Sequence, residues 1–551
     1  MLKKVLLFLL AACFVVQAHA VAEDAQAPRK KLIELGWDIP TTSYIKDHWR
    51  EMEKSAPFDG IVYDLVARNA DGKTCASQSL FTPERWNRDD FKTCVDDLNS
   101  CEFTRYKHNF IRINFYPAQF AWSDDEAWRA VCEKAAICAW VAQQTDDDLC
   151  LDFESYGAHI FKYDPKSNAT FEDAKALARR RGAEFTRAIV KEKSDVTLLC
   201  LWMNSINFAA GRAERPDSVL RAGAYGLLPS FIDGMLDAAR PETRFVEGCE
   251  NGYYMNGREE YQRASLDALL LTGPGAALVS PENRGKYRAQ VSSGFGFYLD
   301  MYSNPEGSRY YRGAEPGETR FDRLCVNLTA AWDAADEYVW VYGEQKRWWA
   351  PTSDAEWTSW EEALPGITEF IAQLSDPERY TAEIKDALLS STTATNLVKN
   401  GNFASRTQSG DGATTFENWG TWRHEDSRGE FTDVDGKPAI KGDVSACYLQ
   451  ALEVEPGRKY LVYGKIGADA STDANLTVRW HDGGGRWVSE WLDVRVVVRR
   501  DAPLDANGRG EAYALVKVPD AARRLVLLLS ASATDGAGTA SFDDVRVYLL
   551  P

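Results

Sequence analysis

Short apolar runs alternate with amphipathic stretches over roughly the first two-thirds of the chain. Strand-like runs lie at 32–37, 60–65, 110–115, 149–153, 196–202, 244–249, 290–299 and 339–342. Helical patterns lie between them, for example at 42–54, 124–144, 172–193, 229–240, 258–271, 320–337 and 356–374. This alternation is typical of a parallel sheet covered by helices. Eight such units predict a (β/α)8 TIM barrel over residues 31–377.

An open, doubly wound sheet is the alternative arrangement of the same elements. Sheets of that kind carry a glycine-rich phosphate-binding turn after the first strand. No such turn follows residues 32–37, so the pattern favours the barrel.

The pattern changes after residue 377. Residues 378–395 combine a short helical stretch at 382–389 with small polar residues, which predicts a linker. From residue 396 onward, alternating runs such as 459–463, 476–480 and 524–529 are separated by residues typical of turns. This spacing predicts an all-β jelly-roll sandwich over residues 396–551.

The first twenty residues have the pattern of an export signal. Lys3 and Lys4 precede an apolar run at 5–16, and Ala18-His19-Ala20 forms a small-residue cleavage site. We therefore expect a secreted or periplasmic bacterial protein. A lipoprotein anchored at Cys13 is the alternative, because Leu10-Ala11-Ala12-Cys13 resembles a lipobox, although the apolar run continues beyond it. No later run is long enough for a transmembrane helix.

Charge and cysteine content exclude some partners. The net charge is −18 and no basic cluster is sustained, so nucleic acid is a poor partner. There is no CxxC pair and the six histidines are scattered, so we expect no metal and no cofactor. Cys150, Cys200 and Cys249 lie in strand-like runs and should be buried. Disulfide pairing among the other cysteines, such as Cys75, Cys94, Cys101, Cys132 and Cys138, stays open.

The run from Asp147 to Glu154 is an apolar strand that ends in two carboxylates. Residues two apart on a strand point to the same face, so Asp152 and Glu154 should emerge together, about 6 to 7 Å apart. Like charges at that separation raise the pKa of one partner. A proton donor at the carboxyl mouth of a barrel is one interpretation. An acidic loop or a metal ligand is the other.

The other strand ends carry carboxylates, amides and aromatic rings. The candidates for substrate contact are Trp37, Asp38, Asn114, Tyr156, Trp202, Asn204, Tyr253, Trp340 and Tyr342. Carboxylates beside aromatic rings suit glycoside cleavage, which needs one protonated acid and a second carboxylate. We assign Glu154 as the general acid, with Asp152 behind it, and Glu344 as nucleophile or base. Glu250 is the reserve for the second role.

The C-terminal region carries a resemblance to a known family. Asn396-Leu397-Val398-Lys399-Asn400-Gly401-Asn402-Phe403, then Trp419, and the closing Ser541-Phe542-Asp543-Asp544-Val545-Arg546-Val547-Tyr548 resemble carbohydrate-binding modules of the family 4/9 (CenC) type. The resemblance implies a glycan-binding jelly roll, often with a structural calcium. Ala404 and Ser405 stand where the family often has an acid, which counts against calcium at Asp543 or Asp544. The expected sugar contacts are Trp419, Trp422, Trp480 and Trp487.

The barrel loosely resembles the (β/α)8 glycoside hydrolases. Many of these carry the acid at the end of strand four, which matches Glu154, and the nucleophile at the end of strand seven, where this chain offers Asp300. A narrower likeness is to the signature DGxDxDxE of the chitinases of glycoside hydrolase family 18, with Asp148 and Cys150 as departures. It implies that an acetamido group of the substrate attacks, with Glu154 as acid and Asp152 as helper.

Together these features predict a secreted glycoside hydrolase that acts on a polysaccharide or glycan and carries a C-terminal glycan-binding module. The alternatives are a chitinase-like, substrate-assisted hexosaminidase and a non-catalytic glycan-binding protein. A lyase or esterase is less favoured, because no G-x-S-x-G elbow is present and basic residues do not crowd the strand ends.

Overall fold

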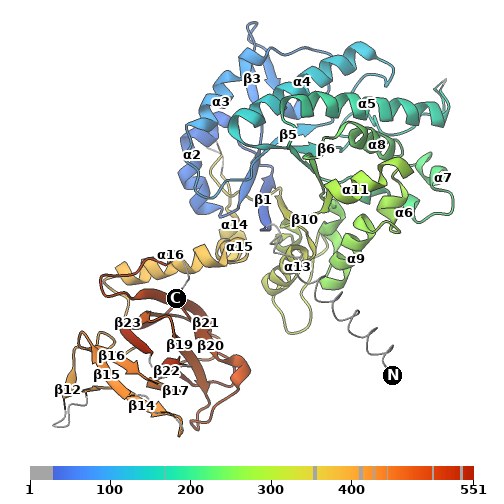
Figure 1. Cartoon of the computed structure of the whole chain (residues 1–551). Helices are drawn as coiled ribbons and strands as arrows, with labels where there is room; N and C mark the ends of the chain where they lie inside the picture. The colour runs from blue at the N-terminus through green and yellow to red at the C-terminus, as the bar shows by residue number, and fades with distance from the viewer. Residues whose placement is uncertain are drawn as a thin grey trace, which may run out of the picture. The chain divides into compact units, whose positions relative to one another are not determined.

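The computed structural model describes residues 29–550, except 168, 352–355, 409–413, 426, 428–429, 443–444, 499–501 and 534–537. The export-signal prediction and Cys13 therefore lie outside the described residues. Contacts divide the chain into two compact units, and the boundary falls between Ser375 and Asp376. Figure 1 shows both units. None of the helices in the described ranges combines the length and apolar character that crossing a membrane requires.

The first unit is a parallel barrel. Its strands are β1 (Lys31–Gly36), β2 (Gly60–Tyr63), β5 (Phe110–Asn114), β6 (Asp148–Asp152), β7 (Thr197–Cys200), β8 (Arg244–Glu247), β9 (Val291–Ser293), β10 (Phe295–Tyr298) and β11 (Tyr338–Gly343). They pair in the order β10-β11-β1-β2-β5-β6-β7-β8-β9. The predicted strands are all present, and the predicted fold class is confirmed.

The seventh strand of the barrel is divided at Gly294, and its two parts pair with different neighbouring strands. Strands β9 and β10 flank Gly294 and together form the seventh strand, with β9 paired to β8 and β10 paired to β11. A Cβ at Gly294 would lie 2.7 Å from Val246 Cγ1 and 2.8 Å from the carbonyl oxygen of Tyr338. Only glycine therefore fits where the strand passes from one neighbour to the other.

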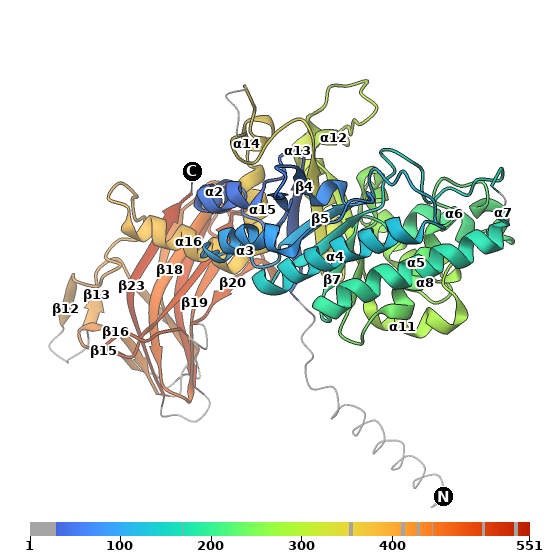
Figure 2. The same ribbon diagram turned by 90° about the horizontal axis from the view of Figure 1, so that it is seen from above.

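Helices surround the strands, as Figures 1 and 2 show. Those that match the predicted stretches are α2 (Thr42–Ser55), α4 (Asp125–Thr145), α5 (Phe171–Glu192), α8 (Leu228–Ala238), α9 (Arg258–Leu269), α13 (Arg320–Ala334), α14 (Trp360–Ala363) and α15 (Ile367–Ser375). The predicted helix at 356–374 is divided into α14 and α15, because Pro365 and Gly366, with φ +93°, interrupt it. Shorter helices include α3 (Lys92–Asn99), α6 (Phe208–Gly211), α7 (Pro216–Leu220), α10 (Pro274–Ala277), α11 (Arg284–Gln290) and α12 (Asp300–Ser303).

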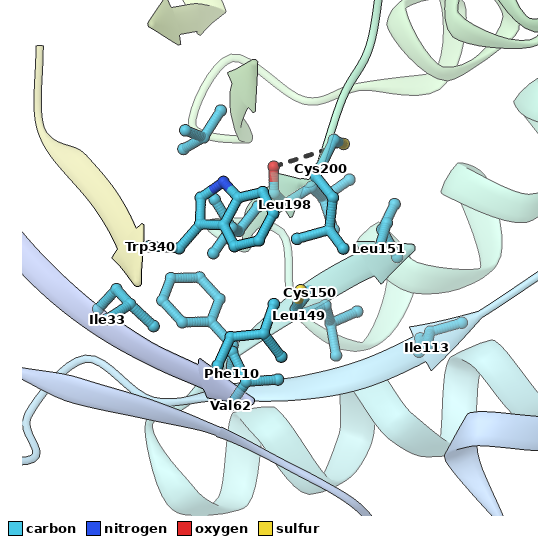
Figure 3. Packing of buried hydrophobic residues seen from close by; sticks show 14 of the residues in the cluster. Ile33, Val62, Phe110, Ile113, Leu149, Cys150, Leu151, Leu198, Cys200 and Trp340 are labelled. Atoms are coloured by element: carbon cyan, nitrogen blue, oxygen red, sulfur yellow. Dashed lines mark hydrogen bonds between the residues drawn. The ribbon is translucent and has the colours of Figure 1, made fainter. Parts of the chain in front are cut away.

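Apolar side chains fill the barrel. Figure 3 shows Val62, Phe110, Leu149, Leu198 and Trp340 packed together inside it. Cys150, Cys200 and Cys249 are buried, as predicted. The ten cysteines in the described part of the chain are all free thiols.

The second unit is an antiparallel sandwich. One sheet has the order β14-β17-β22-β19-β20 and the other β15-β16-β23-β18-β21. The strands are β14 (Gly420–Arg423), β15 (Glu430–Val434), β16 (Lys437–Lys441), β17 (Ser445–Glu453), β18 (Lys459–Ala468), β19 (Thr472–His481), β20 (Val494–Val496), β21 (Gly510–Lys517), β22 (Arg524–Ala533) and β23 (Thr539–Leu549). The predicted all-β region is thus two packed sheets.

A helix in the predicted linker packs on this sandwich. The helix is α16 (Pro377–Ser390), and its Ile384 and Leu388 contact a buried cluster that includes Leu461 and Tyr548. Lys385 Nζ donates to Glu511 Oε2 at 2.7 Å. Residues 377–390 therefore form an ordered part of the second unit.

Candidate active site

The carboxyl ends of the barrel strands surround a pocket of about 390 Å³. It brings together most of the predicted site residues. Those that line it are Trp37, Asn114, Asp152, Glu154, Tyr156, Glu250, Tyr253, Trp340, Tyr342 and Glu344. All four predicted catalytic carboxylates therefore share one cavity, although they come from three separate strands and the segments that follow them.

Asp152 and Glu154 form the first acidic pair. Asp152 is the last residue of β6 and is buried, and its Oδ1 accepts the backbone N–H of Glu154 at 2.8 Å. Tyr156 lines the pocket with both carboxyls, and the charge of Asp152 adds to the burial that raises the pKa of the Tyr156 hydroxyl. Burial raises the pKa of Asp152 to about 7, and the charge of Glu154 adds to the rise. Asp152 can therefore hold a proton near neutral pH.

The pKa of Glu250 is raised further than that of Asp152. It begins a short 3-10 turn, Glu250–Tyr254, directly after Cys249, whose φ is +37°. Burial, followed by the charges of Glu154 and Asp152, raises the pKa of Glu250 to about 9. At neutral pH its carboxyl is protonated and can donate a hydrogen bond. This state argues against Glu250 as the reserve nucleophile.

Glu344 follows β11 and is positioned by its neighbours. Its backbone N–H donates to Asp300 Oδ2 at 2.7 Å, and the N–H of Gln345 donates to Asp300 Oδ1 at 3.3 Å. The Tyr342 hydroxyl donates to Glu344 Oε1 at 3.3 Å and accepts from Trp37 Nε1 at 2.9 Å. Asp300 itself is buried and does not line the pocket. The acid at the end of strand seven therefore anchors the loop that carries Glu344.

Aromatic rings form one wall of the pocket. The Tyr253 and Tyr342 rings lie 5.7 Å apart and 8° from parallel, and Tyr253 meets Trp340 edge-on at 5.4 Å. Trp340 Nε1 donates to the Gly248 carbonyl at 2.8 Å, which fixes the indole. Trp37, 65% exposed, stands at the entrance. Flat aromatic surfaces of this kind suit the apolar faces of sugar rings.

Arg112 is a pocket residue that the sequence reasoning missed. Its guanidinium donates to both carboxylate oxygens of Asp64, at 2.9 and 2.6 Å, and to Gln78 Oε1 at 3.2 Å. It lies on β5 two residues before Asn114, on the same face. Arg112 could have been identified from the sequence, because it is a charged residue within an apolar strand and lies on the same face as Asn114.

Three predicted contact residues do not line this pocket. Asp38 is buried and accepts the Trp348 N–H at 2.8 Å, and burial raises its pKa to about 6. Trp202 is buried against Tyr225, and Asn204 Nδ2 donates to the Gly275 carbonyl at 3.1 Å. The prediction is corrected for these three. For Trp202 and Asn204 the reason is that β7 ends at Cys200, so the two-residue strand period no longer holds beyond it.

The tryptophans predicted to bind sugar on the sandwich divide into two groups. Trp419 and Trp480 belong to the hydrophobic core, and Trp480 is only 1% exposed, so neither is available for sugar contact. Trp422 and Trp487 are exposed, and so is Trp491, at 94%, which the sequence reasoning did not select.

The two acids considered for calcium each have a cationic partner. Asp543 lies 2.8 Å from Lys437 Nζ, and Asp544 lies 2.7 Å from Arg546 Nε. These ion pairs compete with a cation for the same carboxylate oxygens, which adds to the case against calcium there.

Comparisons with known proteins add little. No family model and no curated protein matches the chain. Among solved structures, tailspike protein 4 of bacteriophage CBA120 is 18% identical over 28% of this chain and 21% of its own, with a TM-score of 0.22. A structure titled "CBM4 structure and function" is 19% identical over 28% of this chain and 99% of its own, with a TM-score of 0.20. The CBM22-1–GH10 modules of a Clostridium thermocellum endo-1,4-β-D-xylanase are 17% identical over 24% and 26%, with a TM-score of 0.17. Likenesses at this level carry no conclusion about this chain, and the family 4/9 resemblance stays a prediction.

Proposed function

We propose that the protein is a secreted glycoside hydrolase that uses paired carboxylates. The observation that carries the proposal is the convergence of Glu154 and Glu344 on one pocket. They follow β6 and β11, the fourth and eighth strands of the barrel, which are four positions apart in a ring of eight and so face each other across its mouth. A glycosidic bond between them would have one carboxyl on each side.

The proposed roles follow from the contacts of each acid. Glu154 transfers its proton to the leaving oxygen as the bond from that oxygen to the anomeric carbon breaks. Glu344, held by Asp300 and Tyr342, attacks that carbon or removes a proton from the attacking water. Asp152, whose pKa is about 7, can return a proton to Glu154 through the Tyr156 hydroxyl. Glu250 serves as a neutral hydrogen-bond donor to a sugar hydroxyl.

A substrate-assisted reaction is the second candidate. The buried Asp152 carboxyl directly behind Glu154 favours it, because such a group can orient an acetamido substituent whose oxygen then attacks the anomeric carbon. In that reaction Glu344 is not needed. The effect of Glu344→Gln, and the requirement for a 2-acetamido sugar, separate the two candidates.

The sandwich is proposed to hold the enzyme on its polymer. The exposed Trp422 and Trp491 offer apolar ring surface to a glycan, and Trp487, whose ring carries the Arg479 guanidinium at 3.9 Å on one face, offers its other face. Tethering raises the local substrate concentration without a new catalytic contact.

Release of reducing ends from a panel of polysaccharides tests the proposal. We expect Glu154→Gln and Glu344→Gln each to lower turnover by more than about a hundredfold while binding through residues 396–551 is retained. Glu259→Gln, at an exposed acid on α9, is the matched control and should match the wild type. Unchanged turnover in Glu154→Gln would overturn the assignment of the acid. A wild type that binds glycans and cleaves none would establish the non-catalytic alternative.

A further inference from the structure

A second cleft of about 930 Å³ lies on the outside of the barrel, between α5, α7, α8 and residues 277–284. It shares no lining residue with the pocket at the barrel mouth. Figures 1 and 2 both show α7, α8 and α11 on the same side of the barrel. Its volume lies near the upper end of the range of about 300 to 1,000 Å³ that is usual for ligand sites. The cleft is therefore large enough for a ligand of its own.

Cationic side chains concentrate in this cleft, although the chain as a whole has a net charge of −18. Five basic residues line it, Lys175, Arg179, Arg215, Arg221 and Arg284, against three acids, Glu172, Asp217 and Asp233. An excess of positive charge in a concave surface attracts anions and concentrates them there.

Two of the five cations are already paired. Lys175 Nζ lies 3.1 Å from both carboxylate oxygens of Asp217. Arg179 Nε donates to Asp237 at 2.7 Å, and its Nη1 donates to Glu282 at 2.9 Å. Lys175 and Arg179 therefore form part of the wall of the cleft, and their charges are already neutralised by neighbouring carboxylates.

The other three cations are exposed and have no carboxylate partner within the described ranges. They are Arg215, Arg221 and Arg284. Arg221 lies over the Phe171 ring at 5.0 Å, and Arg284 uses only its Nε, to the Val279 carbonyl at 3.3 Å. Their free N–H groups can therefore bind an oxyanion in the forked, two-point manner that guanidinium groups favour.

The remaining surface of the cleft is largely apolar. Leu220 and Leu278 contribute to it, together with the rings of Pro216, Pro229 and Pro281. Apolar walls with a few well-placed polar groups are the usual composition of a small-ligand site. Such walls can pack against the C–H faces of sugar rings while the guanidinium groups engage their anionic substituents.

We propose that this cleft is a second binding site, for a short segment of an acidic glycan that carries sulfate or carboxylate groups. Three guanidinium groups within a single cleft match a ligand with a few separated oxyanions. A nucleic acid fits less well, because the described residues that line the cleft include no aromatic ring on which a base could stack. The proposal does not depend on hydrolysis at the barrel mouth.

Binding of the full-length chain to dextran sulfate, polygalacturonate and neutral dextran tests this site. We expect at least one of the two acidic polymers to bind at least tenfold more tightly than dextran, and that difference to shrink as salt is added. Tighter binding of dextran sulfate would identify sulfate as the preferred group, and tighter binding of polygalacturonate would identify carboxylate. Because dextran and dextran sulfate share a backbone, binding of neutral sugar by the sandwich cancels in the comparison.

The double variant Arg215→Gln/Arg221→Gln should lose this preference by at least tenfold while keeping the thermal midpoint of the wild type. Arg263→Gln, at an exposed arginine on α9 that does not line the cleft, should leave it intact. Equal binding of all three polymers, or an unchanged preference in the double variant, would overturn the proposal. A single-stranded oligonucleotide that binds at this site as tightly as the acidic glycans would overturn it as well.

Discussion

Replacing Glu250 by glutamine should stabilise the barrel at alkaline pH. The Glu250 carboxyl has an ordinary pKa of 4.5, which we take for the unfolded chain, and a pKa of about 9 in the folded protein, chiefly because it is buried. Between these two values the unfolded chain loses the proton while the folded protein keeps it. Stability is therefore highest below pH 4.5 and falls as the pH rises towards 9. A glutamine does not ionise, so the variant lacks this fall.

The size of the effect follows from the two pKa values. Each unit between them corresponds to about 1.4 kcal/mol, so at pH 8 the ionisation of Glu250 favours unfolding by up to about 5 kcal/mol. Asp152 adds a separate fall between pH 3.8 and about 7, which the Glu250→Gln protein retains. The difference in pH-dependent stability between the wild type and Glu250→Gln therefore reports the ionisation of Glu250 alone.

Calorimetric unfolding at pH 5 and pH 8 provides the assay. We expect the barrel transition of the wild type to drop by several degrees more than that of Glu250→Gln between the two pH values. Glu259→Gln should behave as the wild type. Activity gives a second reading: a neutral hydrogen-bond donor replaced by an amide should cost less than about tenfold in kcat. Equal pH dependence in wild type and variant, or a hundredfold loss of kcat, would refute the interpretation of Glu250 as a protonated donor.

Three further predictions concern other parts of the molecule. Tyr156→Phe removes a hydroxyl that shares the pocket with Asp152 and Glu154, and it should lower kcat/KM by about tenfold with an unchanged fold, measured by steady-state kinetics. An unchanged kcat/KM would exclude a proton path through this hydroxyl. Gly36→Ala places a Cβ 2.8 Å from the Gly343 carbonyl oxygen and should destabilise the barrel by about 1 to 3 kcal/mol in denaturant titration. An unaltered midpoint would show that the paired ends of β1 and β11 move apart at little cost. Trp480→Ala should lower the free energy of unfolding of the sandwich by about 3 to 5 kcal/mol, because the ring is in the core. Trp491→Ala should lower it by less than about 0.5 kcal/mol and weaken retention on glycan columns. The reverse pattern in denaturant titration and in column retention would contradict the placement of Trp480 in the core and Trp491 on the surface.

The barrel was predictable because its physical signal is local. Each strand is a short apolar run between amphipathic helices, and the two-residue period within β11 correctly places Trp340 with Tyr342 in the pocket. Beyond the strand ends the period is no guide: Glu154, two residues after β6, lines the pocket, whereas Trp202, two residues after β7, does not. The division of the seventh strand at Gly294 depends on contacts with two neighbouring strands, which no local pattern reveals.

Protonation and exposure were harder to predict than position. The reserve role of Glu250 was assigned from its place after a strand, but its pKa depends on burial and on two acids that are distant in sequence. Trp480 and Trp491 are chemically alike and close in sequence, and one is core while the other is exposed. The exposed one lies in a short turn that no motif marks.

The role of Glu154 as general acid is the central claim, and a comparison of leaving groups tests it most directly. Protonation of the leaving oxygen matters for a sugar leaving group and hardly at all for a dinitrophenolate. Glu154→Gln should therefore lose more than about a hundredfold in kcat/KM on a natural oligosaccharide, and less than about tenfold on the dinitrophenyl glycoside of the same sugar. Equal losses on both substrates, or none on either, would contradict the assignment.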